Sequence, residues 1–100
     1  MSMIQTGVVE LGSDDPVETA SGNTSTFTRV TFPTPFPSGS QVIVLPFAQT
    51  FNGSDPPGIR LADVNEQGFL IRLNEVLVTG SVKSNGVHAV ETIGWLASTI

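Results

Sequence analysis

The chain has 100 residues, a net charge of −5, only four lysines and arginines, and no cysteine. This length fits a single domain spanning residues 1–100. The shortage of basic residues excludes the positive surface that nucleic acids require and disfavours anionic membranes. The absence of cysteine excludes disulfides, thiolate catalysis and cysteine-based zinc sites.

Two further absences concern membranes and export. No apolar run approaches the roughly eighteen residues of a transmembrane helix, so membrane insertion is not expected. The N-terminus shows neither the basic region nor the apolar region of a signal peptide. The composition therefore leaves the compartment open.

The first third of the chain predicts two strands joined by a loop. Residues 3–11 mix β-branched and polar residues and stop at Gly12, which is typical of a strand. Residues 12–24 are rich in glycine, aspartate, serine and asparagine and predict a loop. Residues 25–32 predict a second strand, because apolar and polar positions alternate along them.

The middle of the chain contains a proline-rich connection and an apolar strand. Residues 33–40 include three prolines, which remove backbone donors and exclude regular structure. Residues 41–47 form a nearly continuous apolar run, the pattern of a strand buried on both faces. Pro46 within this run predicts a bulge, a strand end or an edge position.

The remaining residues predict a hairpin and a final strand. Residues 58–64 and 68–73 read as strands separated by a hairpin-sized connection. Residues 75–82 suggest a short strand broken at glycine, and the Asn85-Gly86 pair that follows is a strong turn signal. The last strand is predicted over residues 87–97.

This succession predicts an all-β domain. Six or seven short strands and no helical periodicity are typical of an antiparallel sandwich or barrel. In a sandwich of two sheets each sheet shows one face to water, yet residues 41–47 and 68–73 are apolar on both faces. The second faces need cover, which either sister copies or a thick layer of loops would supply. A charged content of only 13% favours sister copies, although a surface rich in serine and threonine would also explain it.

The sequence shows no enzyme-like constellation. His88 is the single histidine, and the nearby Ser81 and Ser84 lack the context of an activated nucleophile. Asp14, Asp15 and the glutamate that follows them match no calcium-binding loop. We therefore predict that the protein is not an enzyme and has neither a cofactor nor a metal site.

Arg60 is the candidate functional residue. It stands between Ile59 and Leu61 in an apolar strand, and period two places it on the face of Ala62. An unpaired buried charge is costly, so this guanidinium needs a partner. One hypothesis is a structural ion pair with Glu75, Glu91 or an acid of another subunit. The other is a planar fork of five donors offered to the hydroxyls of a sugar.

Several segments together resemble a known family, the H-type lectins, which are small sugar-binding domains named after a snail agglutinin. The resemblance covers roughly residues 4–97. It is carried by the opening residues 4–12, the segment 30–37, the strand 42–44, Arg60 upstream of the Gly68-Phe69 pair, and the closing residues 93–97.

The resemblance implies a fold, an assembly and a site. The family folds as a six-stranded antiparallel β-sandwich, assembles as a parallel homotrimer and binds a galactose-type sugar between subunits. It implies that Arg60 contacts the sugar. A family carboxylate usually precedes an Asn-Thr pair, but here Gly22 precedes Asn23, so Ser21 and Asn23 would offer weaker hydrogen bonds. His88 is the only ring in the segment that often adds a contact.

The resemblance also assigns structural positions. It places Phe32, Phe36, Phe69 and Trp95 in the core. Some secreted members carry a disulfide at the positions of Leu11 and Leu73, so these two leucines are predicted to touch, and the missing bridge fits a bacterial or phage source. Phe51, in a polar loop, is either an aromatic free to stack on a sugar or a partner, or a cap folded onto the core.

These observations lead to two functional hypotheses. The first is a carbohydrate-binding, cell-adhesion domain with shallow sites between the subunits of a homotrimer. Its ligands would be glycans, with galactose or N-acetylgalactosamine favoured, bound by Arg60, Ser21, Asn23 and His88. The alternative is a structural trimerisation or attachment module, as in a phage tail fibre or surface appendage. Both favour an extracellular or virion-surface location. What Arg60 contacts distinguishes them.

Overall fold

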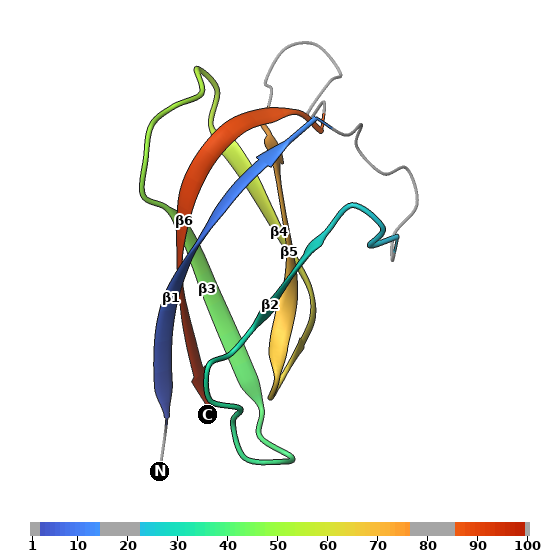
Figure 1. Cartoon of the computed structure of the whole chain (residues 1–100), viewed down its shortest axis with the longest axis vertical. Coiled ribbons are helices and arrows are strands. Elements are labelled where there is room, and N and C mark those ends of the chain that lie inside the picture. The colour runs from blue at the N-terminus through green and yellow to red at the C-terminus, as the bar shows by residue number, and fades with distance from the viewer. Residues whose placement is uncertain (1–2, 15–22, 77–85, 100) are drawn as a thin grey trace.

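The computed structural model describes residues 3–14, 23–76 and 86–99, which form two three-stranded antiparallel sheets (Figure 1). The first sheet has the order β1-β6-β3 and the second the order β2-β5-β4. The strands are β1 (Ile4–Ser13), β2 (Thr28–Thr31), β3 (Val42–Ala48), β4 (Pro57–Asn65), β5 (Gly68–Glu75) and β6 (His88–Thr99). The predicted all-β class is confirmed.

The strand positions follow the sequence pattern closely. Each of the six main predicted segments overlaps one observed strand, and five of the six strands extend one to two residues beyond the predicted ends. The largest shortening is in β2, which keeps only four residues of the predicted 25–32. The short strand predicted at 75–82 falls almost wholly outside the described residues, as do residues 15–22 of the loop predicted at 12–24. At the start of that predicted loop, Gly12 and Ser13 belong to β1 instead. Among the residues described, no helix is long and apolar enough to cross a membrane.

The proline-rich segment is fastened to the β4–β5 hairpin. The backbone N–H of Phe32 donates to the carbonyl of Gln67 at 2.9 Å, and that of Phe36 donates to Glu66 at 2.8 Å. The Asn65 side chain accepts from the backbone N–H groups of Gln67 and Gly68 and so fixes the turn. These bonds hold Phe32 and Phe36 against the hairpin, and both rings are buried in the core cluster.

The core lies between the sheets and is built around four aromatic rings. Phe32, Phe36, Phe69 and Trp95 are buried, with ring centroids 5.1 to 5.8 Å apart in tilted and edge-on pairs. The predicted core role of these residues is confirmed. Leu11 and Leu73, predicted to touch, are both buried in the same cluster as the rings.

The strand β3 corrects one prediction. Val42 and Val44 are buried, but the alternate residues of the strand are exposed, so this chain does not cover both of its faces. The strand lies at the edge of its sheet, as Pro46 predicted, because an edge strand tolerates a missing donor.

The strand β5 behaves as predicted for a two-sided apolar segment. It is the central strand of its sheet, and nearly all of its residues are buried. Its core side carries Phe69, Ile71 and Leu73. On its outer side the chain itself supplies cover, since residues from the segments before β2 and before β6 bond to the β5 side chain of Arg72.

Replacing Phe69 by alanine tests this core. The ring is 0% exposed and packs against both Phe32 and Trp95, so we expect the free energy of unfolding to fall by about 3–5 kcal/mol. Phe51→Ala is the matched control; its ring is 89% exposed, and we expect a change within about 0.5 kcal/mol. Chemical denaturation followed by tryptophan fluorescence measures both. Equal losses would contradict the described core.

Candidate functional site

Arg60 points away from the core. Its neighbours Ile59 and Leu61 pack against the core cluster, so the alternation of the strand directs Arg60 to the outer face of the β2-β5-β4 sheet. The side chain is exposed and forms no hydrogen bond or salt bridge with any described residue. The ion pair within the chain to Glu75 or Glu91 is not formed. Both carboxylates lie on the core sides of their strands, where they contact His88, whereas Arg60 lies on the outer face.

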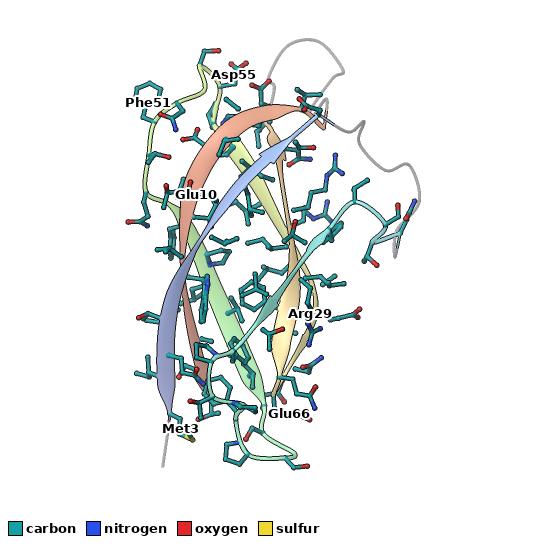
Figure 2. All side chains as sticks on the ribbon, in the orientation of Figure 1. Met3, Glu10, Arg29, Phe51, Asp55 and Glu66 are labelled. Carbon is teal, nitrogen blue, oxygen red and sulfur yellow. The ribbon has the colours of Figure 1, made fainter. Side chains whose placement is uncertain are left out.

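Two more arginines share this outer face. Arg72 on β5 lies directly opposite Arg60 on β4, and Arg29 on β2 lies opposite Leu70, one row further along β5. Ala62 completes the row of Leu70 on the β4 side. All three arginines of the sequence therefore gather on one face of one sheet, which we call the arginine face. Figure 2 labels Arg29 on β2.

The three guanidinium groups differ in their surroundings. Arg72 is 3% exposed; its Nη1 donates to the hydroxyl of Thr26, and its Nη2 donates to the carbonyl of Gly86 at 3.0 Å. It thus ties the segments before β2 and before β6 to β5. Arg29 resembles Arg60, since it is exposed and forms no hydrogen bond or salt bridge with the described residues. The face carries one fixed cation and two free ones.

This arrangement defines what the face can bind. Arg60 and Arg72 lie directly opposite each other on neighbouring strands. Like charges in this position repel each other and destabilise the sheet unless another group offsets their charge. A guanidinium presents five donors and no acceptor, and its fork matches paired oxygens. Hydroxyl pairs, carboxylates and sulfates all supply such oxygens.

Of the other predicted site residues, Asn23 lies in the turn that leads into β2, and Ser21 is outside the described residues. The Asn23 side chain accepts from the backbone N–H of Ser25 at 3.2 Å, which shapes the turn leading into β2. The same turn includes Thr26, which accepts from Arg72. The structure therefore brings the turn after Asn23 to the arginine face.

His88 is in a different environment from the one predicted for a sugar contact. Its ring is buried, with Nε2 2.7 Å from a Glu91 oxygen and Nδ1 3.3 Å from a Glu75 oxygen. Gly53 packs so closely on the ring that any side chain at that position would collide with it. An enclosed ring offers no surface to a ligand, so His88 is left out of the site proposed below.

Glu91 is the centre of this buried network. The carboxylate is 1% exposed and accepts from the Thr50 hydroxyl at 2.7 Å, the backbone N–H of Asn52 at 3.0 Å, that of Gly53 at 3.2 Å, and His88. Its hydrogen bond with His88, followed by that with Thr50, lowers the pKa of Glu91 to about 2.

Sequence reasoning missed this role, although the sequence carries a signal for it. Period two along the last strand places Glu91 on the face of Ile93, Trp95 and Ala97. A carboxylate on a core-facing position must be hydrogen-bonded, because burying an unsatisfied charge is costly.

The network also fixes the loop between β3 and β4. Thr50 and Asn52 both bond to Glu91, and the Asn52 side chain donates to the carbonyl of Val90 at 2.8 Å. Phe51 stands between them with 89% of its surface exposed, and Figure 2 shows its ring projecting from the loop. The alternative in which this ring caps the core is therefore wrong for the single chain.

The outer face of the β1-β6-β3 sheet has the opposite character. Its exposed large apolar side chains are Ile4, Val8, Ile43, Leu45 and Phe47, which we call the apolar face. Ile4 and Ile43 lie on either side of Ser98 of β6, and Val8 and Phe47 lie on either side of Gly94. Leu45 lies opposite Leu96. Because Gly94 has no side chain, a hollow of about 460 Å³ opens between β1 and β3.

Comparison of the chain with family models, curated proteins and solved structures finds no match. Its function is therefore inferred from its own residues and their placement.

The Glu91 network predicts how stability depends on pH. The unfolded chain binds a proton on Glu91 near the ordinary pKa of 4.5, whereas the folded chain does so only near 2. Acid therefore favours the unfolded state. The contribution of Glu91 is complete above about pH 4.5, declines as the pH falls, and is lost below about pH 2.

We expect Glu91→Gln to have a lower free energy of unfolding at neutral pH and a shallower loss between these two pH values. Denaturant titrations at several pH values between about 2 and 7 measure the free energy of unfolding of each protein. Glu10→Gln is the control, because Glu10 is exposed and its carboxylate bonds only to the Thr92 hydroxyl among the described residues. A Glu91→Gln curve that parallels the native curve would show that this carboxylate does not set the acid response.

Proposed function

We propose that the protein is a carbohydrate-binding domain of the H-type lectin kind, with Arg60 as the anchor of its sugar site. The observation that carries the proposal is the state of Arg60, which is exposed, lies beside two other arginines and has no partner among the described residues. A purely structural arginine would be expected to contact a carboxylate or a carbonyl, as Arg72 does with Gly86.

The surroundings of Arg60 support a shallow site. Leu70 and Ala62 are half-buried and offer an apolar floor, and the turn that begins at Asn23 adds polar groups at the edge. The family-type carboxylate is replaced by Gly22, which removes a charge-assisted hydrogen bond worth about 1.5–3 kcal/mol. We therefore propose weak single sites, which gain from several copies acting together.

We further propose that three copies assemble with their apolar faces toward a common axis. Five large apolar side chains on this face are exposed in the single chain, on two strands that flank β6. Soluble monomers rarely leave a contiguous apolar patch of this kind uncovered. Association would also add burial to a small domain, whose own core stabilises it only modestly.

The alternative is a structural trimerisation or attachment module, as in a tail fibre or surface appendage, without sugar binding. The apolar face favours it as much as it favours a lectin, since assembly does not require a ligand. In that module Arg60 would pair with an acid of another copy through a second contact, made by the arginine face.

Glycan binding by Arg60→Ala distinguishes the two functions. We expect the native protein to bind a subset of an immobilised glycan panel and Arg60→Ala to lose at least ten-fold in affinity, because the main donor fork is gone. Its unfolding transition should stay within about 0.5 kcal/mol of the native one, since the side chain is exposed. Ser38→Ala, in the loop between β2 and β3, is the control. Absence of binding by the native protein at high concentration would favour the structural module.

Assembly is tested separately by Leu45→Glu. Leu45 lies in the middle row of the apolar face, so a carboxylate there would be desolvated in any packed interface. We expect light scattering after gel filtration to give three chain masses for the native protein and one for Leu45→Glu. Ser38→Glu, with the same added charge on an exposed loop, should remain trimeric. A native protein of one chain mass would overturn the proposed assembly.

A further inference from the structure

The charges of this chain are distributed unevenly between its two sheets. The chain is acidic overall, with nine carboxylate residues against four lysines and arginines. Yet three of those four cations lie on the outer face of the β2-β5-β4 sheet. A cationic face on an acidic chain is a local feature that composition does not produce by itself.

The described carboxylates near this face do not pair with its arginines. Glu75 and Glu91 lie on the core sides of β5 and β6, where both contact His88. Asp63 on β4 is exposed and forms no salt bridge with a described residue. Glu10 lies on the other sheet and accepts from the hydroxyl of Thr92 at 2.8 Å. Among the described residues, therefore, no salt bridge reaches Arg29 or Arg60.

The two free guanidinium groups are positioned to act on one ligand. Arg29 and Arg60 lie on the strands that flank β5, one row apart. The spacing of strands and residues in a sheet places their Cα atoms about 12 Å apart. Arg29 lies in one cross-strand row with Leu70 of β5 and Ala62 of β4. The short side chain of Ala62 makes the surface shallow next to Arg60. Two long side chains can thus reach over this floor from opposite sides.

A negative ligand gains more at this face than a neutral one. A carboxylate or sulfate forms charge-assisted hydrogen bonds with guanidinium groups, and these bonds are about twice as strong as those that a neutral sugar accepts.

We infer that the ligand of the arginine face is an acidic saccharide, a sugar that carries a carboxylate or a sulfate group. This inference rests on the proposed sugar-binding function and names its ligand class. Arg60 binds the sugar, and Arg29 selects for its negative group.

The test is a calorimetric titration of the assembled native protein with three ligands that share one core: lactose, sialylated lactose and sulfated lactose. We expect at least one acidic form to bind ten-fold or more tightly than lactose at low salt. The ratio of affinities should shrink toward one as sodium chloride approaches about 1 M, because salt screens exposed charges. The sialylated and sulfated arms separate a carboxylate preference from a sulfate preference.

Arg29→Gln supplies the decisive variant. The side chain is exposed and free of hydrogen bonds to the described residues, so the fold should be retained, and the ratio of acidic to neutral affinity should fall at least three-fold. Ser38→Glu lowers the net charge by the same amount on the exposed loop between β2 and β3, and it should keep the native ratio.

The outcomes are distinguishable. Lactose binding that equals or exceeds binding of both acidic forms overturns the inference and leaves the proposed sugar-binding function in place. No binding of any of the three, together with no binding on the wider glycan panel, overturns the sugar-binding function itself. Dissociation of the assembly by Arg29→Gln would show that an acid of a sister copy occupies the face, which also overturns the inference.

Discussion

Every sheet has two faces, and packing two sheets against each other covers only the inner face of each. The inner faces hold the aromatic cluster around Phe69 and Trp95. Period-two alternation then commits every second residue of each strand to an outer face that the other sheet cannot reach. The outer faces are where this small chain differs from a generic β domain, and both are unusual, one apolar and one cationic.

The two outer faces suit different partners. The apolar face presents Leu45 and its neighbours without charge, which suits association with identical copies. The arginine face presents donors without acceptors, which suits a ligand rich in oxygen. Since the two faces lie on opposite sides of the core, assembly through one leaves the other open. A trimer built in this way would display several ligand sites at once, and weak sites on one assembly gain through avidity.

The buried network around Glu91 links these faces to the loops. A carboxylate on the core side of β6 draws donors from the β3–β4 loop and contacts the same histidine as Glu75 at the end of β5. This arrangement has two consequences. It holds the loop through hydrogen bonds on both sides of Phe51, whose ring stays exposed. It also keeps both acids on the core sides of their strands, away from the outer face on which Arg60 lies.

Local sequence patterns were enough to predict the strands and the proline-rich connection, because period-two alternation and missing backbone donors act over a few residues. The aromatic core was expected from the family resemblance, and Arg60 from its apolar strand together with that resemblance. That Arg29, Arg60 and Arg72 share one face could not be predicted, because it depends on the register of β5 with β4 and with the sequence-distant β2. The same holds for the burial of His88 between two glutamates and for the open outer side of β3. The type of a residue limits the contacts that it can form. Which of those contacts it does form depends on how distant strands pair.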